Sequence, residues 1–112
     1  MLNQVVLVGR LVRDVQLNVS NDKKKTYITL AIPRSYRNVN GCYDSDFISC
    51  VLWQGIAENT ATYCKKGDII GIRGRIESNS YEKGSKTVYT SDIVVERVFF
   101  LPSKKEVIKE EE

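Results

Sequence analysis

Short segments rich in valine, isoleucine and leucine, separated by polar turns, constrain the fold of this chain more than any other feature of its sequence. Their composition predicts β-strands over residues 4–12, 26–32, 47–53, 69–77 and 87–101. Residues 56–66 differ, because Ile56, Thr60 and Cys64 recur near helical spacing and Gly67 suits the end of a helix. The predicted order is three strands, one short helix and two strands.

This order predicts an all-β chain with the OB-fold, a five-stranded Greek-key barrel with one short helix between its third and fourth strands. Gly9 predicts a bend or bulge in the first strand, and Pro33 is expected to end the second. A break is expected in the last strand near Glu96 and Arg97. The remaining polar segments are predicted to be loops, over residues 18–25, 34–46 (with a turn at Asn40-Gly41) and 78–86.

The length of 112 residues fits one domain. We expect that domain to cover residues 1–102. A short charged tail, predicted to be flexible, follows over residues 103–112.

The third strand carries the clearest pattern. Successive side chains of a strand point to opposite faces, so Ile48, Cys50 and Leu52 can share the core while Phe47 and Trp53 point outward. In the fourth strand, the same alternation assigns Ile70, Ile72 and Ile76 to the core and Arg73 and Arg75 to the outer face. Exposed aromatic rings beside cations are typical of a surface that binds single-stranded nucleic acid.

Further aromatic and basic residues extend this prediction, because Tyr36 and Tyr81 have cations close by in the sequence. We predict that bases stack on four side chains: Tyr36, Phe47, Trp53 and Tyr81. We predict phosphate or electrostatic contacts from nine cations: Arg10, Arg34, Arg37, Lys65, Lys66, Arg73, Arg75, Lys83 and Lys86.

Each assignment has a structural alternative. A partner subunit or a loop could cover Phe47 and Trp53, and the two tyrosines could be ordinary loop residues. Arg73 and Arg75 could pair with carboxylates such as Glu77, and the sequence favours this pairing and a DNA contact equally. The lysine run 23–25 is better explained as a solvated loop than as a contact. The net charge of +3 decides little by itself.

Composition argues against an enzyme. The chain has no histidine, which excludes a Ser–His–Asp triad or a histidine-ligated metal, and no glycine loop is followed by the residues of a P-loop. The three cysteines are too few and too widely spaced for a zinc site, so inert thiols are expected. No cofactor or metal is expected. Without a signal peptide or a membrane-length apolar run, the expected location is the cytoplasm, in association with the nucleoid.

Four segments, in order and at matching spacing, resemble bacterial-type single-stranded DNA-binding proteins. They are residues 1–11 with Asp14, 46–53 running into 57–59, 65–67 through 74–76, and Tyr89-Thr90 with the valine-rich stretch that follows. The resemblance covers residues 1–101. It implies an OB-fold that assembles as a homotetramer, a dimer of dimers, with single-stranded DNA wrapped over its outer surface.

The resemblance also implies a role: binding and protection of single-stranded DNA, whatever its sequence, in replication, recombination and repair. The family's stacking positions match Tyr36, Phe47, Trp53 and Tyr81. Two of them are tryptophan in well-known members, so weaker stacking is expected at the tyrosines. The chain ends at Glu112 without the family's glycine-rich linker and apolar tip. Either the protein is short by nature or the sequence is a piece of a longer one, so the resemblance does not imply recruitment of partner proteins through such a tail.

Two alternatives remain open at this point. One is an OB-fold protein-interaction module like the dimeric primosomal accessory proteins. The other is RNA binding, which OB-folds also support.

Overall fold

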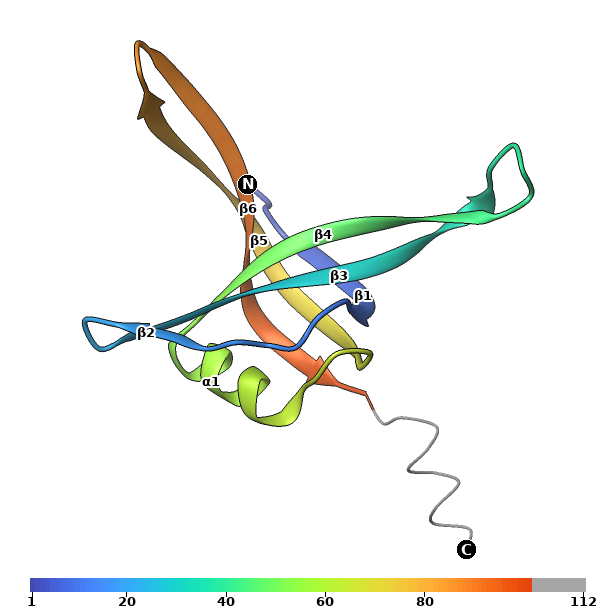
Figure 1. The fold of residues 1–112 in the computed structure, drawn as a ribbon, viewed down its shortest axis with the longest axis horizontal. Helices are drawn as coiled ribbons and strands as arrows, with labels where there is room; N and C mark the ends of the chain where they lie inside the picture. The colour runs from blue at the N-terminus through green and yellow to red at the C-terminus, as the bar shows by residue number, and fades with distance from the viewer. Residues whose placement is uncertain (102–112) are drawn as a thin grey trace, which may run out of the picture.

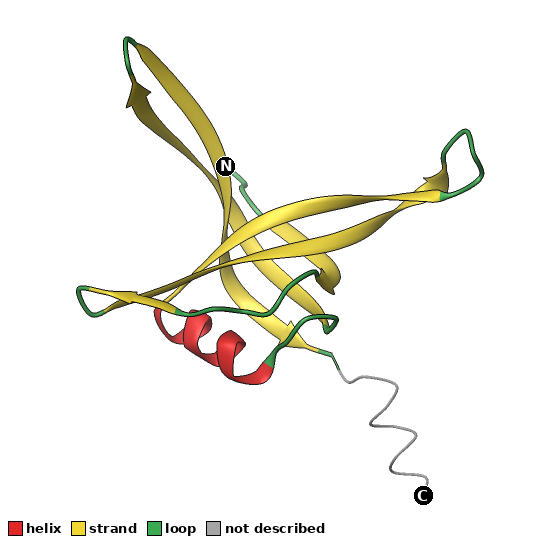
Figure 2. Cartoon of the chain, viewed as in Figure 1, coloured by secondary structure: helices red, strands yellow, loops and turns green. Residues whose placement is uncertain are grey.

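A computed structural model describes residues 1–101 of the chain, which are mostly β-strand with one α-helix (Figure 2). The elements in chain order are β1 (Val5–Leu11), β2 (Asn18–Ser20), β3 (Lys23–Arg37), β4 (Tyr43–Trp53), α1 (Gln54–Tyr63), β5 (Ile69–Lys83) and β6 (Lys86–Phe100). Because β2 is a short strand of the β2–β3 hairpin, the predicted order of long strands and helix is confirmed. The predicted tail, 103–112, lies outside the described residues.

The five long strands close into a ring. Their hydrogen-bonded order is β1-β5-β6-β4-β3, and β1 pairs with β3 again to complete the circle, while β2 adds to the outer edge of β3. All of these pairings are antiparallel except that of β4 with β6. The ring and its single helix agree with the predicted OB-fold. Within the described residues, no helix is long and apolar enough to cross a membrane.

Gly9 lies where the ring closes. β1 pairs with β5 from Val5 to Arg10, and Arg10 and Leu11 also pair with β3. A side-chain Cβ at position 9 would lie only 2.9 Å from Cγ1 of Ile32 and 3.0 Å from the carbonyl oxygen of Ala31. A larger residue would therefore hold β1 away from β3. Gly9 was predicted to mark a bend or bulge, but the register of β1 with β5 runs through Gly9 without a shift, so no bulge lies there. Glycine at this position instead permits the close approach of β1 to β3.

The core fills the ring, and α1 lies beneath one of its ends (Figure 1). The predicted inward residues Cys50, Leu52, Ile70 and Ile72 are buried, and Ile48 is half-buried against them. Ile76 was assigned to the core, but it is 48% exposed. It has the inward parity, yet the pairing of β5 with β1 ends at Gly74, so Ile76 lies at the rim of the ring and is covered on one side only by its partner Ile93.

Three predicted loops are largely β-hairpins. β3 runs through Pro33 to Arg37, with a register shift between the two residues, so Pro33 does not end the strand. The expected loop 34–46 is reduced to a tight turn at residues 38–42, which includes the predicted Asn40-Gly41. The β2–β3 and β5–β6 hairpins replace most of the loops 18–25 and 78–86. We call the outer parts of two hairpins, residues 33–45 and 77–92, the β3–β4 arm and the β5–β6 arm. The polar composition of these arms suggested loops because both of their faces are open to solvent.

Two smaller predictions have mixed outcomes. The break near Glu96 is confirmed as a bulge, because Arg73 pairs with Arg97 but Gly74 pairs with Val95, which leaves Glu96 unmatched. The helix, in contrast, begins at Gln54 and ends at Tyr63, with Cys64 as its C-cap. Gly67 does have a positive φ of 93°, but it lies in a separate turn, not at the helix end.

Candidate nucleic-acid interface

The outer face of β3 and β4 carries the predicted aromatics. Residues that pair across two strands point to the same side, and Trp53 pairs with Lys25 while Phe47 pairs with Ala31. Phe47 is 66% exposed and Trp53 39% exposed, as their parity predicts. The same parity places Val51 outward, yet it is buried, because β6 continues the sheet beside it.

Arg10 shares a cross-strand row with Phe47. It pairs with Ala31 of β3, which in turn pairs with Phe47 of β4, so the three residues form one row across the outer face. Its side chain is exposed. Strand pairing thus places this predicted cation on the same sheet face as Phe47, with Ala31 between them.

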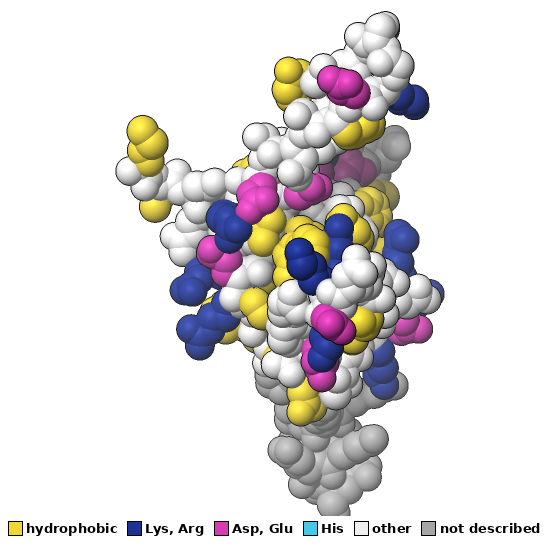
Figure 3. Space-filling model, turned by 90° about the vertical axis from the view of Figure 1, so that its left-hand side faces the viewer, with side chains coloured by type: hydrophobic (Ala, Val, Ile, Leu, Met, Phe, Trp, Pro, Cys, Tyr) yellow, Lys and Arg dark blue, Asp and Glu magenta, His cyan; other side chains and the backbone are white. Residues whose placement is uncertain are grey.

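Tyr27 is a residue that sequence reasoning missed. It pairs with Val51 and lies on the same face as Trp53, with 54% of its surface exposed. The ammonium group of Lys25 lies over both rings, 4.7 Å from the Tyr27 centroid and 4.8 Å from the Trp53 centroid. A hydrophobic patch with cations on it is visible near the middle of Figure 3. The alternation within residues 26–32 could have found Tyr27.

The β3–β4 arm carries Tyr36, Arg34 and Arg37, all exposed. The Arg37 guanidinium lies 5.5 Å from the centroid of the Tyr43 ring. Arg34 is held by Asp46, with Nη2 donating at 2.8 Å and Nε at 3.1 Å to the same carboxylate oxygen. These hydrogen bonds raise the pKa of Arg34 and lower the pKa of Asp46. The charge of Arg34 is therefore already paired.

The second projecting arm, β5–β6, carries Tyr81, Lys83 and Lys86. Tyr81 is half-exposed and pairs with Val88, and the two lysines pair with each other near the tip. Figure 1 shows that this arm and the β3–β4 arm project in different directions. Tyr36 and Tyr81 are therefore on separate arms.

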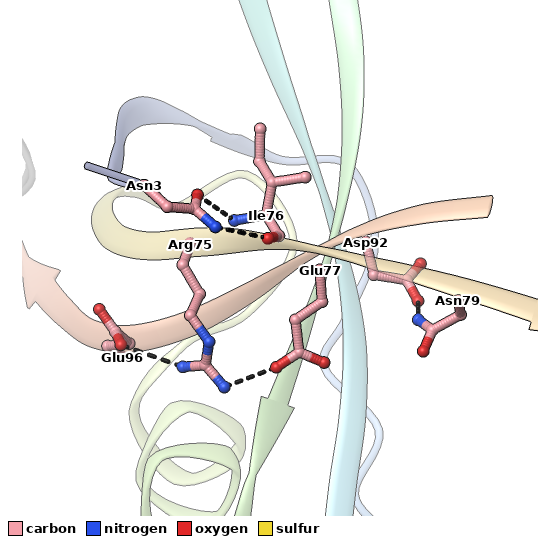
Figure 4. A network of polar contacts seen from close by, with 7 residues as sticks. All are labelled: Asn3, Arg75, Ile76, Glu77, Asn79, Asp92 and Glu96. Atoms are coloured by element: carbon pink, nitrogen blue, oxygen red, sulfur yellow. Dashed lines mark hydrogen bonds and ion pairs between the residues drawn. The ribbon is translucent and has the colours of Figure 1, made fainter. Parts of the chain in front are cut away.

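A polar network lies at the base of the β5–β6 arm (Figure 4). Arg75 donates one hydrogen bond to Glu77 at 2.6 Å and another to Glu96 at 3.0 Å, and these carboxylates raise its pKa. The alternative of carboxylate pairing is thus correct for Arg75. Arg73 is half-buried and lies opposite Arg97.

The last two predicted cations, Lys65 and Lys66, lie in the turn that follows α1 and are exposed. The backbone N–H of Lys66 donates to Asp14 at 2.8 Å, which attaches this turn to the segment after β1. The structure therefore divides the predicted residues among the β3–β4 face with Arg10 of β1 beside it, the two arms, the β1–β5 part of the ring, where Arg73 lies, and the end of the helix.

The cysteines do not form a site. Cys50 and Cys64 are buried and Cys42 is exposed, and burial raises the pKa of the Cys50 thiol to about 11. Among residues 1–101, no three His, Cys, Asp or Glu side chains are grouped so that they could hold a metal ion.

Comparison with known proteins adds an independent observation. Residues 2–101 match the model of the single-strand binding protein family. The chain is 42% identical over 106 residues to single-stranded DNA-binding protein B of Bacillus subtilis. The matched region covers 93% of this chain and 94% of that protein. It is 43% identical to the single-stranded DNA-binding protein of Oceanobacillus iheyensis and 42% identical to that of Lactiplantibacillus plantarum. The chain spans 66% and 54% of those two proteins, respectively.

Proposed function

The chain belongs to the single-strand binding protein family, and we propose that it binds single-stranded DNA without sequence preference by stacking bases on its exposed aromatic rings. Proteins of this family bind DNA and are not enzymes, and their general roles are in replication, recombination and repair. We place the protein in the cytoplasm, at the nucleoid. We also propose that residues 1–102 form the binding domain and that the charged segment 103–112 lies outside it.

The observation that carries the stacking mechanism is the outward position of Phe47 and Trp53 on one sheet face. Base stacking contributes about 1–3 kcal/mol per base in proteins of this kind, a range measured partly on this protein class. Every base has a ring face, so stacking tolerates any sequence. We extend the path to Tyr36 and Tyr81, whose arms project from the ring and could follow a wrapped strand.

Phosphates would meet the predicted cations. Among residues 1–101, the ion pairs hold three cations, which are Lys24, Arg34 and Arg75. Arg10, Arg37, Lys65 and Lys66, together with the arm-tip Lys83 and Lys86, are exposed and take no part in these ion pairs. We propose that these six supply most of the phosphate contacts and that Arg73 adds to the local positive potential. Arg34 and Arg75 contribute only where DNA competes with their carboxylates.

We also propose a homotetramer. On the outer side of the ring, the side chains of Val6 and Val8 are more than half exposed. Gly71 pairs with Val8 on one side and with Phe99 on the other, so Phe99, which is 40% exposed, belongs to the same apolar group. Exposed apolar residues grouped in this way favour an interface with another protein surface. β1 has β5 on one side but, from Val5 to Val8, no strand of residues 1–101 on its other side. A second copy could pair there.

The test is a titration with oligo-dT that follows Trp53 fluorescence. We expect quenching on binding, and Phe47→Ala should weaken binding by roughly 5- to 150-fold, equivalent to about 1–3 kcal/mol. Tyr89→Ala is the matched control, because Tyr89 is exposed and points to the opposite side of its hairpin from Tyr81. Unchanged emission at saturating DNA would contradict the proposed position of the bases.

Competition with RNA and duplex DNA of equal length completes the test. Clear preference for either competitor would overturn the assignment of single-stranded DNA as the partner.

A further inference from the structure

We propose that Tyr27 and the hollow beside it form an additional nucleotide-binding subsite, which extends the DNA path from Trp53 across β3 towards the end of α1. This inference rests on the proposed function. Its occupant is a nucleotide of the same strand that stacks on Trp53, and Lys25 lies between the two stacking rings.

The first observation is the arrangement of Lys25, Tyr27 and Trp53. The two rings lie on one sheet face, and a single ammonium group lies within 4.8 Å of both ring centroids. Lys24, the next residue, is held by Glu58 on the helix, so its charge is paired. Lys25 instead lies over two half-exposed aromatic rings, on a face that has the ring-and-cation chemistry of single-strand binding.

The second observation is an open hollow of about 560 Å³ next to Tyr27. Its volume is within the roughly 300–1,000 Å³ of ligand sites and is enough for a nucleotide. The hollow is lined by Tyr27 with Arg13, Asp14, Gln16, Asn18 and Lys66. Asn18 pairs with Lys25, so the hollow opens on the same side of β3 as the two rings.

The charges of the hollow suit a phosphate. Arg13 and Lys66 are exposed and belong to none of the ion pairs among residues 1–101. Asp14, the one acidic lining residue, accepts the Lys66 backbone N–H at 2.8 Å. The hydroxyl of Thr26 donates to the Gln16 carbonyl at 2.6 Å and holds the lining segment against β3. The hollow therefore has two cations for phosphate and a fixed wall.

These groups imply a specific binding step. A base that stacks on Tyr27 displaces the Lys25 ammonium from that ring, and the ammonium turns to the phosphate that joins this nucleotide to the one on Trp53. The following phosphate meets Arg13 and Lys66. The strand would thus cross β3 at this point.

The test compares Tyr27→Ala and Tyr27→Phe in titrations with oligo-dT long enough to saturate the protein. We expect Tyr27→Ala to weaken binding by roughly 5-fold or more, as for the loss of one stacked base. Tyr27→Phe keeps the ring and should bind as the parent does. Arg13→Gln should reduce the slope of log K against log salt by about 0.7, the change for one lost phosphate contact on a single strand.

Phe47→Ala and Tyr89→Ala distinguish the possible failures. If Phe47→Ala weakens binding but Tyr27→Ala binds like Tyr89→Ala, the additional subsite is wrong and the proposed function stands. If Phe47→Ala has no effect, the proposed stacking face itself fails. A loss in Tyr27→Phe as large as in Tyr27→Ala would overturn stacking at this position. Thermal unfolding of each variant shows whether the fold is retained, which we expect because Tyr27 is half-exposed.

Discussion

At the scale of single residues, the cations of this protein differ in whether their charge is available to bind a phosphate or is already paired with a carboxylate. Arg34 and Arg75 each bind carboxylates through two guanidinium nitrogens, whereas Arg10 and Arg37 form no ion pair among residues 1–101. Both kinds are exposed or half-buried and look alike in the sequence. A phosphate can bind the second kind directly but must displace a carboxylate from the first.

This difference predicts the effect of Asp46→Asn. The change removes the carboxylate that holds Arg34, so we expect tighter binding of oligo-dT at low salt. The salt slope should become steeper by about 0.7 as Arg34 gains a phosphate contact. The measurement is affinity as a function of salt concentration.

Asp44→Asn is the control, because it changes the net charge equally on the same arm. Asp44 accepts a hydrogen bond from Asn38 at 3.0 Å and forms no ion pair with Arg34. Equal slopes for the two variants would show that the Arg34–Asp46 pair does not restrain the arginine.

At the scale of elements, the β5–β6 pair depends on one close approach. At Gly74, opposite the bulge at Glu96, an added Cβ would lie 2.2 Å from the carbonyl oxygen of Val94, which is backbone and cannot turn aside. The two strands join the ring to the second arm, and this contact lies where the arm begins. Glycine is required here because the strands approach so closely.

Gly74→Ala should therefore destabilise the fold by about 3 kcal/mol or more, at the upper end for overpacking. Gly55→Ala is the matched control: Gly55 lies in α1, and an added Cβ would meet no atom within 4 Å. Alanine favours a helix over glycine, by about 0.8–1 kcal/mol in a helix interior, so this change should be neutral or stabilising. Chemical denaturation measures both. Similar stabilities for the two variants would contradict the close approach.

At the scale of the whole molecule, the outer ring surface and the two arms suggest how copies assemble and how DNA passes between them. The exposed valines of β1 lie on the outer side of the ring, and Val8 shares a cross-strand row with Phe99. Assembly through β1 would leave the face with Phe47 and Trp53 open to DNA. It would also bring several such faces into one particle, around which a strand could wrap.

We expect light scattering to give a mass four times that of the 12.8 kDa chain. Val8→Glu should reduce this mass, because it places a charge in the proposed interface. Val19→Glu is the control, because Val19 is equally exposed but lies on the β2–β3 hairpin. A stable dimer for the parent protein across the micromolar range would exclude the tetramer and favour a dimeric interaction module. Dissociation by Val19→Glu would place the interface elsewhere.

Three features followed from the sequence alone: the order of the long strands along the chain, the helix between the third and fourth of them, and the outward position of Phe47 and Trp53. These follow from local periodicity, because residues two apart in a strand share a face wherever the strand lies. The structure confirmed them. The lengths of the strands were underestimated at Pro33 and beyond Glu77, because solvated hairpin arms have the polar composition of loops.

Only the tertiary structure decided which of these outward residues lie together and which charges are already paired. Lys25 contacts Trp53, which is 28 residues further along the chain. The Lys24–Glu58 and Arg75–Glu96 ion pairs likewise join different elements. Such contacts depend on strand register and on ring closure at Gly9, which no short stretch of sequence encodes. The physical reason is that side-chain direction is a local property of a strand, whereas the neighbours of a side chain are set by the packing of the whole ring.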